Sequence, residues 1–463
     1  MWWIYQFLAA LALLVAGPWL LLLRHRHYLP TMRGRFGGDS AIDETAAAGA
    51  GEPSRAAAPR LSGPPRAAGL WIHGVSVGET VLAGNLAGRL PADLPLLFTT
   101  ITPTGQAQAR SNARRLGSRA AVAYLPFELG FAIRRFFRRF APAALVLVEG
   151  DFWPLLLRAV RRRGMPIAVV NGRVSDRSFP RLLAIRRLVQ PLFFASVDRF
   201  GVQTPVDAER LRALGVPAER ITVTGNLKFD APEPPELPEL TARLERLAAG
   251  RPILVAGSTM EGEEAEVLAA FERIAGSGDA PGGTSRDRAL LVLAPRHPER
   301  FAAVAELVAQ VDPGFVRRSG EDRPRPAIFL LDSIGELAST YRLATAAFVG
   351  GTLRPTGGHN PLEAARCGVP VAVGPSMTNF REIADLFDRS GAWARVDSGS
   401  ALGDLWRTWL SDHPAAEAIG ERGRALVAAN AGAIDRTLAL LAPLIQHARA
   451  SASTVESAAA ASR

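Results

Sequence analysis

The sequence uses almost no lysine and almost no cysteine. Lys228 is the only lysine among its 54 basic residues, so arginine supplies nearly all of the positive charge. A compact ammonium kept in such a chain favours a functional role for Lys228, with chance survival as the alternative. The single cysteine, Cys367, excludes an internal disulfide bond, and a chain without disulfides suits a reducing compartment.

Sequence motifs for metal ions are also missing. No pair of cysteine or histidine residues has the spacing of a zinc site, and no Asp-x-Asp motif is present to hold a metal against a diphosphate. We therefore predict neither a metal site nor a cofactor.

The strongest local signal is the glycine-rich stretch Phe348–Phe380, whose glycines surround His359. A helix is predicted to begin at Asn360, because Pro361 suits its first turn and Glu363 can close the cap. Backbone N–H groups and the helix dipole would both favour an anion there, although the spacing is not that of a Walker or dinucleotide motif. We expect a phosphorylated ligand at this loop, and a tight turn that binds nothing is the alternative.

Residues 1–27 are predicted to form a membrane anchor. The run Trp2–Leu23 is apolar apart from Gln6 and is long enough to cross a bilayer core of about 30 Å as a helix. Arginines follow this run instead of preceding it, which argues against a cleaved signal peptide and places the remaining chain in the cytoplasm. A monotopic hairpin or an interfacial helix is the alternative, and residues 28–68 are typical of a flexible linker.

From Leu70 onward, short apolar strands alternate with helices in two series separated by a proline-rich segment. Such alternation predicts doubly wound parallel sheets, whose ligands bind at the carboxyl ends of the strands. The predicted divisions are an N-terminal domain (69–230), an inter-domain linker (231–248), a C-terminal domain (249–447) with a surface insertion (276–288), and a disordered tail (448–463).

Two carboxylates in the first series occupy strand ends. Glu79 can act as a general base if a partly closed site raises its pKa, or it can merely complement the dipole of the helix that it opens. Glu149 ends a very apolar strand beside Asp151, a position that favours a functional site over scaffold.

Four residues in the second series could contact an anion or a nucleotide. Arg296 and His297 follow an apolar strand and can bind a phosphate or a carboxylate. Ser258, at a predicted helix start, is either an anion contact or an ordinary cap. Glu363 either caps its own helix or reaches a ribose hydroxyl.

The segment from Arg110 to Arg187 carries 17 arginines and four acidic residues. Arginine runs with interleaved phenylalanines would also suit nucleic acid. Behind a membrane anchor we prefer the anionic surface of the inner membrane or a phosphorylated lipid, and we expect no nucleic acid. A solvated helix face is the remaining alternative.

A series of ordered motifs extends from Leu70 to Leu386: WIHGVSVGE, TTITPTG, EGDFWP, NGRVSDRS, GNLKFD, AGSTMEGEE, PRHPERF, GELASTY, GGHNPLEAA and GP…NF. Through these motifs the chain resembles the Kdo transferase (3-deoxy-D-manno-octulosonic acid transferase) family of lipopolysaccharide biosynthesis. The resemblance implies an α/β, GT-B glycosyltransferase in which two Rossmann-like doubly wound domains face a cleft, with an N-terminal membrane anchor helix.

The resemblance also implies an activity. The enzyme would be an inverting, metal-independent glycosyltransferase that moves Kdo from CMP-Kdo to a hydroxyl of the lipid A precursor, lipid IVA. It would work at the cytoplasmic face of the cell inner membrane. Two rivals remain: a membrane-associated GT-B enzyme that uses a UDP-sugar, and a non-catalytic lipid-binding relative.

The resemblance assigns roles to individual residues. Glu79 becomes the base that takes the proton of the acceptor hydroxyl, and Glu149 and Lys228 become groups that stabilise the transition state. The residues assigned to substrate binding are Pro295, Arg296, His297, Ile334, Gly335, Glu336, Gly358, His359, Asn360, Pro361, Leu362 and Glu363.

Overall fold

The computed structural model of the chain describes residues 31–37, 69–274 and 288–461, with side chains up to residue 454. The anchor predicted at 1–27 lies outside the described residues. So does nearly all of the insertion predicted at 276–288, and so does most of the linker predicted at 28–68.

The described part of that linker differs from the prediction. Residues 31–35 are helical, and Arg35 donates from its Nε to the Oγ1 of Thr31 at 3.0 Å. The ring of Phe36 packs edge-on against Phe127, with centroids 5.1 Å apart, and is stacked on Phe131. These ring contacts hold residues 31–37 in place, so this part of the chain is not a flexible linker.

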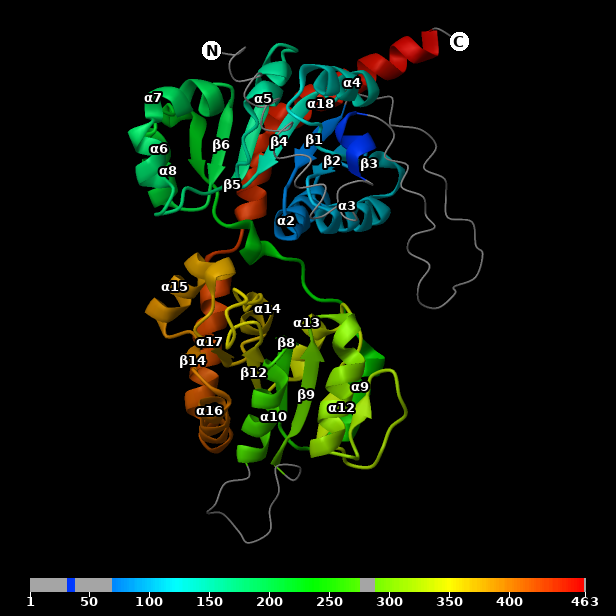
Figure 1. Cartoon of the computed structure of the whole chain (residues 1–463), viewed down its shortest axis with the longest axis vertical. Coiled ribbons are helices and arrows are strands. Elements are labelled where there is room, and N and C mark those ends of the chain that lie inside the picture. Colours follow the sequence, from blue (N-terminus) through cyan, green and yellow to red (C-terminus); the bar gives the residue numbers. More distant parts are fainter. Residues whose placement is uncertain (1–30, 38–68, 275–287, 462–463) are drawn as a thin grey trace. The chain divides into compact units, whose positions relative to one another are not determined.

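The chain folds as two compact units, each built around a parallel sheet of seven strands (Figure 1). Unit 1 comprises Met1–Ala231 with Gly432–Arg463, and unit 2 comprises Pro232–Ala431. The predicted α/β class with two doubly wound sheets is confirmed.

The sheet of unit 1 has the strand order β3-β2-β1-β4-β5-β6-β7, and every neighbouring pair is parallel. Its strands are β1 (Leu70–His73), β2 (Leu96–Thr100), β3 (Ala120–Tyr124), β4 (Ala144–Val148), β5 (Ile167–Gly172), β6 (Arg199–Val202) and β7 (Ile221–Val223). Its helices are α2 (Val77–Ala87), α3 (Pro103–Leu116), α4 (Gly130–Phe140), α5 (Pro154–Arg161), α6 (Phe179–Ala184), α7 (Arg186–Val189), the π-helix η3 (Gln190–Phe194), α8 (Pro205–Ala213), the 3-10 helix η5 (Leu227–Asp230) and α18 (Ala433–Ala461).

The strands of unit 1 are apolar along their length because helices cover both faces of the sheet. In β4 all five residues are buried. One core cluster, which includes Trp71 and Phe136, lies beneath α4, α5 and α8. The other, which includes Ile72 and Leu441, lies beneath α2, α3 and α18. Each such buried side chain contributes about 1.5–3 kcal/mol, so these two layers hold the strand ends in fixed positions.

The C-terminal helix α18 belongs to unit 1 and corrects two predicted boundaries. The C-terminal domain does not extend to residue 447, and the tail predicted to be disordered is helical as far as Ala461. Ala433, Leu441, Leu444 and Ala448 are buried in the same core cluster as strands β1 and β4. This apolar stripe gives the end of the chain a surface to pack on, which composition alone did not reveal.

Within the described ranges, one helical stretch, His413–Thr454, is long and apolar enough to cross a membrane by length and composition alone. It consists of α17 (His413–Ala429) and α18, which a turn separates. One side of α18, which includes Leu441 and Leu444, is buried in the core of unit 1.

The sheet of unit 2 has the order β10-β11-β9-β8-β12-β13-β14, again with parallel neighbours. Its strands are β8 (Ile253–Thr259), β9 (Leu290–Pro295), β10 (Val316–Arg317), β11 (Ile328–Leu330), β12 (Ala346–Val349), β13 (Val371–Val373) and β14 (Ala394–Arg395). Its other helices are α9 (Pro238–Ala248), α10 (Glu263–Arg273), α12 (Phe301–Val311), α13 (Leu337–Thr340), α14 (Leu362–Arg366), α15 (Arg381–Ser390) and α16 (Gly399–Ser411).

Helix α9 occupies most of the predicted inter-domain linker and is an integral part of unit 2. Leu240 and Leu244 on this helix are buried. Arg243 donates to the backbone oxygens of Arg317 and Arg318, at 3.1 and 2.8 Å. Within the proline-rich segment that suggested a linker, only the residues before Pro238 therefore lie outside a helix.

Candidate functional site

Two residues at the carboxyl edge of the unit 1 sheet have left-handed backbone conformations. Glu149 follows β4 with φ 64°, and Asn171 lies near the end of β5 with φ 54°. Residues other than glycine adopt such angles at a cost of about 1–3 kcal/mol and are often found at functional sites. The Nδ2 of Asn171 donates to the Oε1 of Glu149 at 3.2 Å, and its Oδ1 accepts from the backbone N–H of Leu227 at 2.9 Å. Asn171 thereby connects Glu149 to the turn η5 that carries Lys228.

The pKa of Glu149 is influenced by the other two predicted catalytic residues. Burial raises the pKa of Glu149, the positive charge of Lys228 opposes this rise, and the negative charge of Glu79 adds to it. Glu79 follows β1, Glu149 follows β4 and Lys228 follows β7, and because these strands belong to one parallel sheet, the three residues lie at its carboxyl edge.

Glu79 lies in the first turn of α2, whose N-cap is Ser76. Its carboxylate accepts from the backbone N–H of Val75 at 2.7 Å and from the hydroxyl of Ser76 at 2.8 Å. These bonds show that Glu79 closes the start of its helix, which is one of its two predicted roles, and its role as a general base stays a prediction.

The cluster also contains residues that the sequence did not single out as catalytic. Burial raises the pKa of Asp151, and the charge of Glu79 raises it further. The guanidinium of Arg173, just after β5, acts on Glu149 in the opposite direction. Asn171 and Arg173 belong to the NGR segment at a strand end, which is the signal that could have identified them.

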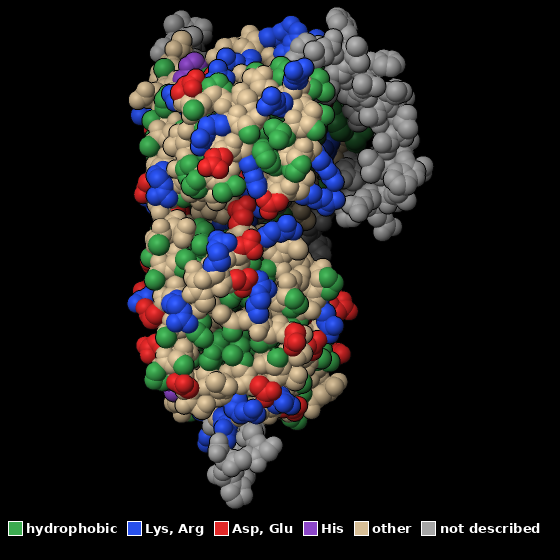
Figure 2. Space-filling view, turned by 90° about the vertical axis from the view of Figure 1, so that its left-hand side faces the viewer, with side chains coloured by type: hydrophobic (Ala, Val, Ile, Leu, Met, Phe, Trp, Pro, Cys, Tyr) green, Lys and Arg blue, Asp and Glu red, His purple; other side chains and the backbone are tan. Residues whose placement is uncertain are grey.

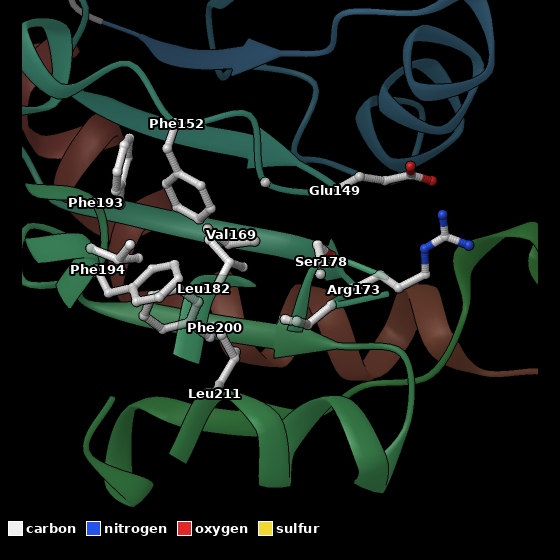
Figure 3. Close-up of a pocket in the computed structure, with 14 residues that line it drawn as sticks. Glu149, Phe152, Val169, Arg173, Ser178, Leu182, Phe193, Phe194, Phe200 and Leu211 are labelled. Atoms are coloured by element: carbon white, nitrogen blue, oxygen red, sulfur yellow. The ribbon is translucent and has the colours of Figure 1, made fainter. Parts of the chain in front are cut away.

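An apolar cavity of about 320 Å³ opens beside Glu149 in unit 1 (Figure 3). Its lining comes from the end of β4, from β5 and β6, and from helices α6, α7, η3 and α8. The carboxylate of Glu149 and the guanidinium of Arg173 lie together at one end of this group of residues.

The glycine-rich loop of unit 2 is organised by a buried carboxylate. Glu263, which has no exposed surface, accepts from the backbone N–H groups of Gly351, Thr352 and Leu353 at 2.6, 2.8 and 2.9 Å. It also accepts from the N–H of Met260 at 2.9 Å. The first N–H groups of the loop, predicted to bind an anion, are therefore satisfied by the protein itself.

The predicted helix start at Asn360 is close to the structure but not identical. Helix α14 begins at Leu362 and ends at Arg366, and the Oδ1 of Asn360 accepts from the N–H of Leu362 at 3.1 Å. The helix predicted at Ser258 is wrong, because β8 continues to Thr259 and α10 begins only at Glu263.

His359 is close enough to Arg296 and His297 for their charges to act on it. Burial and, to a smaller extent, the positive charges of Arg296 and His297 together lower its pKa to about 4, so the ring is neutral at pH 7. Within the described part of the chain its buried Nε2 has no hydrogen-bond partner. A side chain at Gly351 would collide with the ring, since a Cβ there would lie 2.7 Å from its Cδ2.

Glu363 is also influenced by the charge of Arg296. Burial raises its pKa, whereas a hydrogen bond from Asn360 at 3.2 Å and the charge of Arg296 act to lower it. Glu363 therefore bonds to the side chain of Asn360 just before α14, and its two predicted roles stay predictions.

The remaining residues that are predicted to bind the substrate follow strands β11 and β9. Ile334 is 61% exposed, and Gly335 has φ 92°. Burial alone would raise the pKa of Glu336, but bonds from Arg318 and Ser333 outweigh it and lower that pKa. Strand order places β11, β9, β8 and β12 side by side and parallel, so the segments Ile334–Glu336, Pro295–His297 and Gly358–Glu363 all follow the same edge.

Among the described residues, no group of three or more histidine, cysteine, aspartate or glutamate side chains could hold a metal ion.

Comparison with known proteins gives consistent results. Residues 44–231 match the family described as 3-Deoxy-D-manno-octulosonic-acid transferase (kdotransferase). The 3-deoxy-D-manno-octulosonic acid transferase of Haemophilus influenzae is 34% identical over 82% of this chain and 87% of its own length. The enzyme of the same name from Bordetella pertussis is 37% identical over 81% and 87%.

A solved structure shares the fold. The UDP-GlcNAc 2-epimerase of Neisseria meningitidis, bound to UDP-GlcNAc, matches with a TM-score of 0.54 and 12% sequence identity, covering 81% of this chain and 99% of that one. At this identity the likeness concerns the fold alone, which is a GT-B-like pair of α/β units.

Proposed function

The chain belongs to the 3-deoxy-D-manno-octulosonic acid (Kdo) transferase family, and from this membership we propose how it transfers Kdo from CMP-Kdo in lipopolysaccharide core biosynthesis. The acceptor is a hydroxyl of the lipid A precursor lipid IVA, and the transfer inverts the anomeric centre without a metal ion. The observation that carries the proposal is the cluster of Glu79, Glu149 and Lys228 at one edge of the unit 1 sheet.

Glu79 is the general base of this proposal. The acceptor hydroxyl gives its proton to the Glu79 carboxylate while its oxygen forms a bond to the anomeric carbon of Kdo. The bond from that carbon to the phosphate oxygen breaks, and its electron pair leaves with CMP. The bonds from Val75 and Ser76 support this role, because a carboxylate held in one orientation needs no rearrangement to accept the proton.

Glu149 and Lys228 stabilise the charges that develop during transfer. A carboxylate near the sugar offsets positive charge on the anomeric carbon, and an ammonium offsets negative charge on the departing phosphate. The mutual influence of the two groups supports this pairing, since Lys228 holds the pKa of Glu149 below the value that burial alone would give.

CMP-Kdo is held by unit 2 in this proposal. Arg296 and His297 bind its phosphate, and the neutral His359 offers its unpaired Nε2 as one more polar contact. Exposed Ile334 and the open backbone at Gly335 suit a nucleoside, and Glu363 is available for the ribose. The further contacts are Pro295, Glu336, Gly358, Asn360, Pro361 and Leu362.

We also propose that the enzyme works at the cytoplasmic face of the inner membrane, anchored through residues 1–27. In unit 1 the apolar residues Phe131, Ile185 and Leu188 are 53%, 53% and 48% exposed, and α4, α6 and α7 carry arginines around them. Basic and apolar side chains are interspersed on the face of unit 1 drawn in Figure 2. This combination supports contact with an anionic lipid surface.

A donor panel tests the function. The purified enzyme is incubated with lipid IVA and with CMP-Kdo or a series of UDP-sugars, and products are identified by mass spectrometry. We expect the mass of Kdo to be added from CMP-Kdo alone. Turnover of UDP-sugars with none of CMP-Kdo would overturn the proposal.

Replacing Lys228 by methionine should lower kcat by about 10²–10³-fold, the usual loss for one group that stabilises transition-state charge. The pH profile should change as well. Lys228 lowers the pKa of Glu149, so its removal leaves Glu149 protonated up to a higher pH, and the acidic limb of kcat should move upward. Initial rates measured across the pH range check both effects.

Lys228→Arg is the matched control, because it keeps the charge but not the compact ammonium. Its acidic limb should stay near that of the wild type even if kcat falls. A Lys228→Met enzyme with wild-type kcat and an unmoved limb would contradict the role given to this lysine.

A further inference from the structure

The cavity beside Glu149 is almost entirely apolar. Aromatic and aliphatic side chains line it, and beyond Glu149 and Arg173 the only polar side chain is that of Ser178. Its volume of about 320 Å³ is at the lower end of the range of about 300–1,000 Å³ found for small-molecule sites.

The polar and apolar parts of the cavity lie at opposite ends. In Figure 3 the charged groups of Glu149 and Arg173 point to one side, and Phe152, Phe193 and Phe194 lie at the other. A ligand that fits this arrangement has a polar head and an apolar tail. A free nucleotide or a sugar alone would leave the apolar end uncovered.

The wall of the cavity contains an unusual backbone segment. Phe193 and Phe194 belong to the π-helix η3, which follows α7 directly. π-helical turns are rare and are frequently found at functional sites, because the wider turn changes the direction of the side chains that follow. Here it supplies two of the rings that face the cavity.

We propose that this cavity binds one saturated acyl chain of the lipid acceptor, with the acceptor sugar left at the mouth beside Glu149. This inference rests on the proposed function, since that function makes the acceptor a lipid whose sugar hydroxyl reacts. The end of the acyl chain lies among Phe193 and Phe194 of η3 and Phe152, which follows β4. Burial of the methylenes of the acyl chain fixes the acceptor sugar near the carboxylates.

The test narrows the cavity and follows chain-length preference. Leu182 on α6 lines the cavity and is half-buried, so Leu182→Trp fills space without replacing a deeply buried residue. With CMP-Kdo and lipid IVA analogues of long, medium and short acyl chains, this variant should raise KM for the long-chain acceptor about tenfold. That is the loss expected when about two methylenes are no longer buried. Turnover of the short-chain and deacylated acceptors should stay close to that of the wild type.

Two further variants control the result. Ala184→Trp adds the same ring at an exposed position of the same helix and should leave chain-length preference unchanged. Phe193→Ala enlarges the cavity and should shift preference toward longer chains, which is the opposite direction to Leu182→Trp. Circular dichroism and thermal unfolding check that each variant folds.

A photolabelling arm does not depend on turnover. A saturated fatty acid carrying a diazirine, added to the full-length wild-type enzyme, should label peptides that contain Leu182 or Phe193, and lipid IVA should compete with it. Equal loss on acylated and deacylated acceptors in Leu182→Trp, or labelling outside the cavity, would overturn the inference. If the cavity is labelled without competition and CMP-Kdo is never used, the proposed function fails and the acceptor is not the occupant.

Discussion

Replacing Glu79 by alanine is expected to lower turnover by about 10²–10⁴-fold, the contribution usual for a general base in the transition state. The folded structure should persist. The variant loses the bonds from Val75 and Ser76, but losing a helix-start contact of this kind costs only about 1 kcal/mol. Initial rates with CMP-Kdo and lipid IVA measure the effect, and urea unfolding measures the stability.

Glu79→Gln is the control that separates the two roles of this residue. Its amide oxygen can still accept from the backbone of Val75, but it cannot take a proton from the acceptor. A glutamine variant that folds normally and is as inactive as the alanine variant supports the base. Wild-type turnover in either variant would assign Glu79 to the start of its helix alone.

Replacing Glu263 by alanine should destabilise unit 2 by about 4 kcal/mol or more. The change leaves four backbone N–H groups, those of Met260, Gly351, Thr352 and Leu353, without their acceptor in a buried place. Each buried donor left unsatisfied costs about 1–3 kcal/mol, and water can reach only part of this site. Because these groups fix the loop that ends at His359, CMP-Kdo binding should be lost as well. Urea unfolding and calorimetric titration with CMP-Kdo measure the two effects.

Glu272→Ala provides the comparison, because Glu272 is an exposed glutamate on the same helix α10. Its effect on the free energy of unfolding should lie within about 0.5 kcal/mol of zero. If Glu263→Ala were as stable as Glu272→Ala and bound CMP-Kdo normally, the buried carboxylate would not organise the glycine-rich loop.

The alternation of strands and helices could be predicted from the sequence because its signals are local. Strand β1 begins at Leu70, where the predicted alternation of strands and helices begins, and Thr102 caps α3 with Pro103 in the first turn. Apolar runs, caps and prolines act over a few residues, and a single sequence contains them in full.

Contacts between distant segments could not be predicted in this way. The glycines of Phe348–Phe380 predicted free N–H groups, but the acceptor for several of them is Glu263, which lies far earlier in the chain. Likewise, the role of Asn171 depends on Leu227, a residue on a different element. Sequence spacing identified the strand ends where functional residues are expected. It did not identify the distant residues that form hydrogen bonds there.

The placement of α18 has a consequence for biosynthesis of the protein. The strands of unit 1 lie between Leu70 and Val223, but the helix α18 that covers one face of their sheet comes from Ala433–Ala461, so the sheet lacks this helix until late in translation. Domains usually fold in the order of their synthesis. Here unit 2 is synthesised later but can finish folding first, because the apolar surface of β1 and β4 is buried only when α18 has been made. Until α18 is synthesised, apolar side chains that it buries in the finished unit 1 are therefore exposed on the nascent chain.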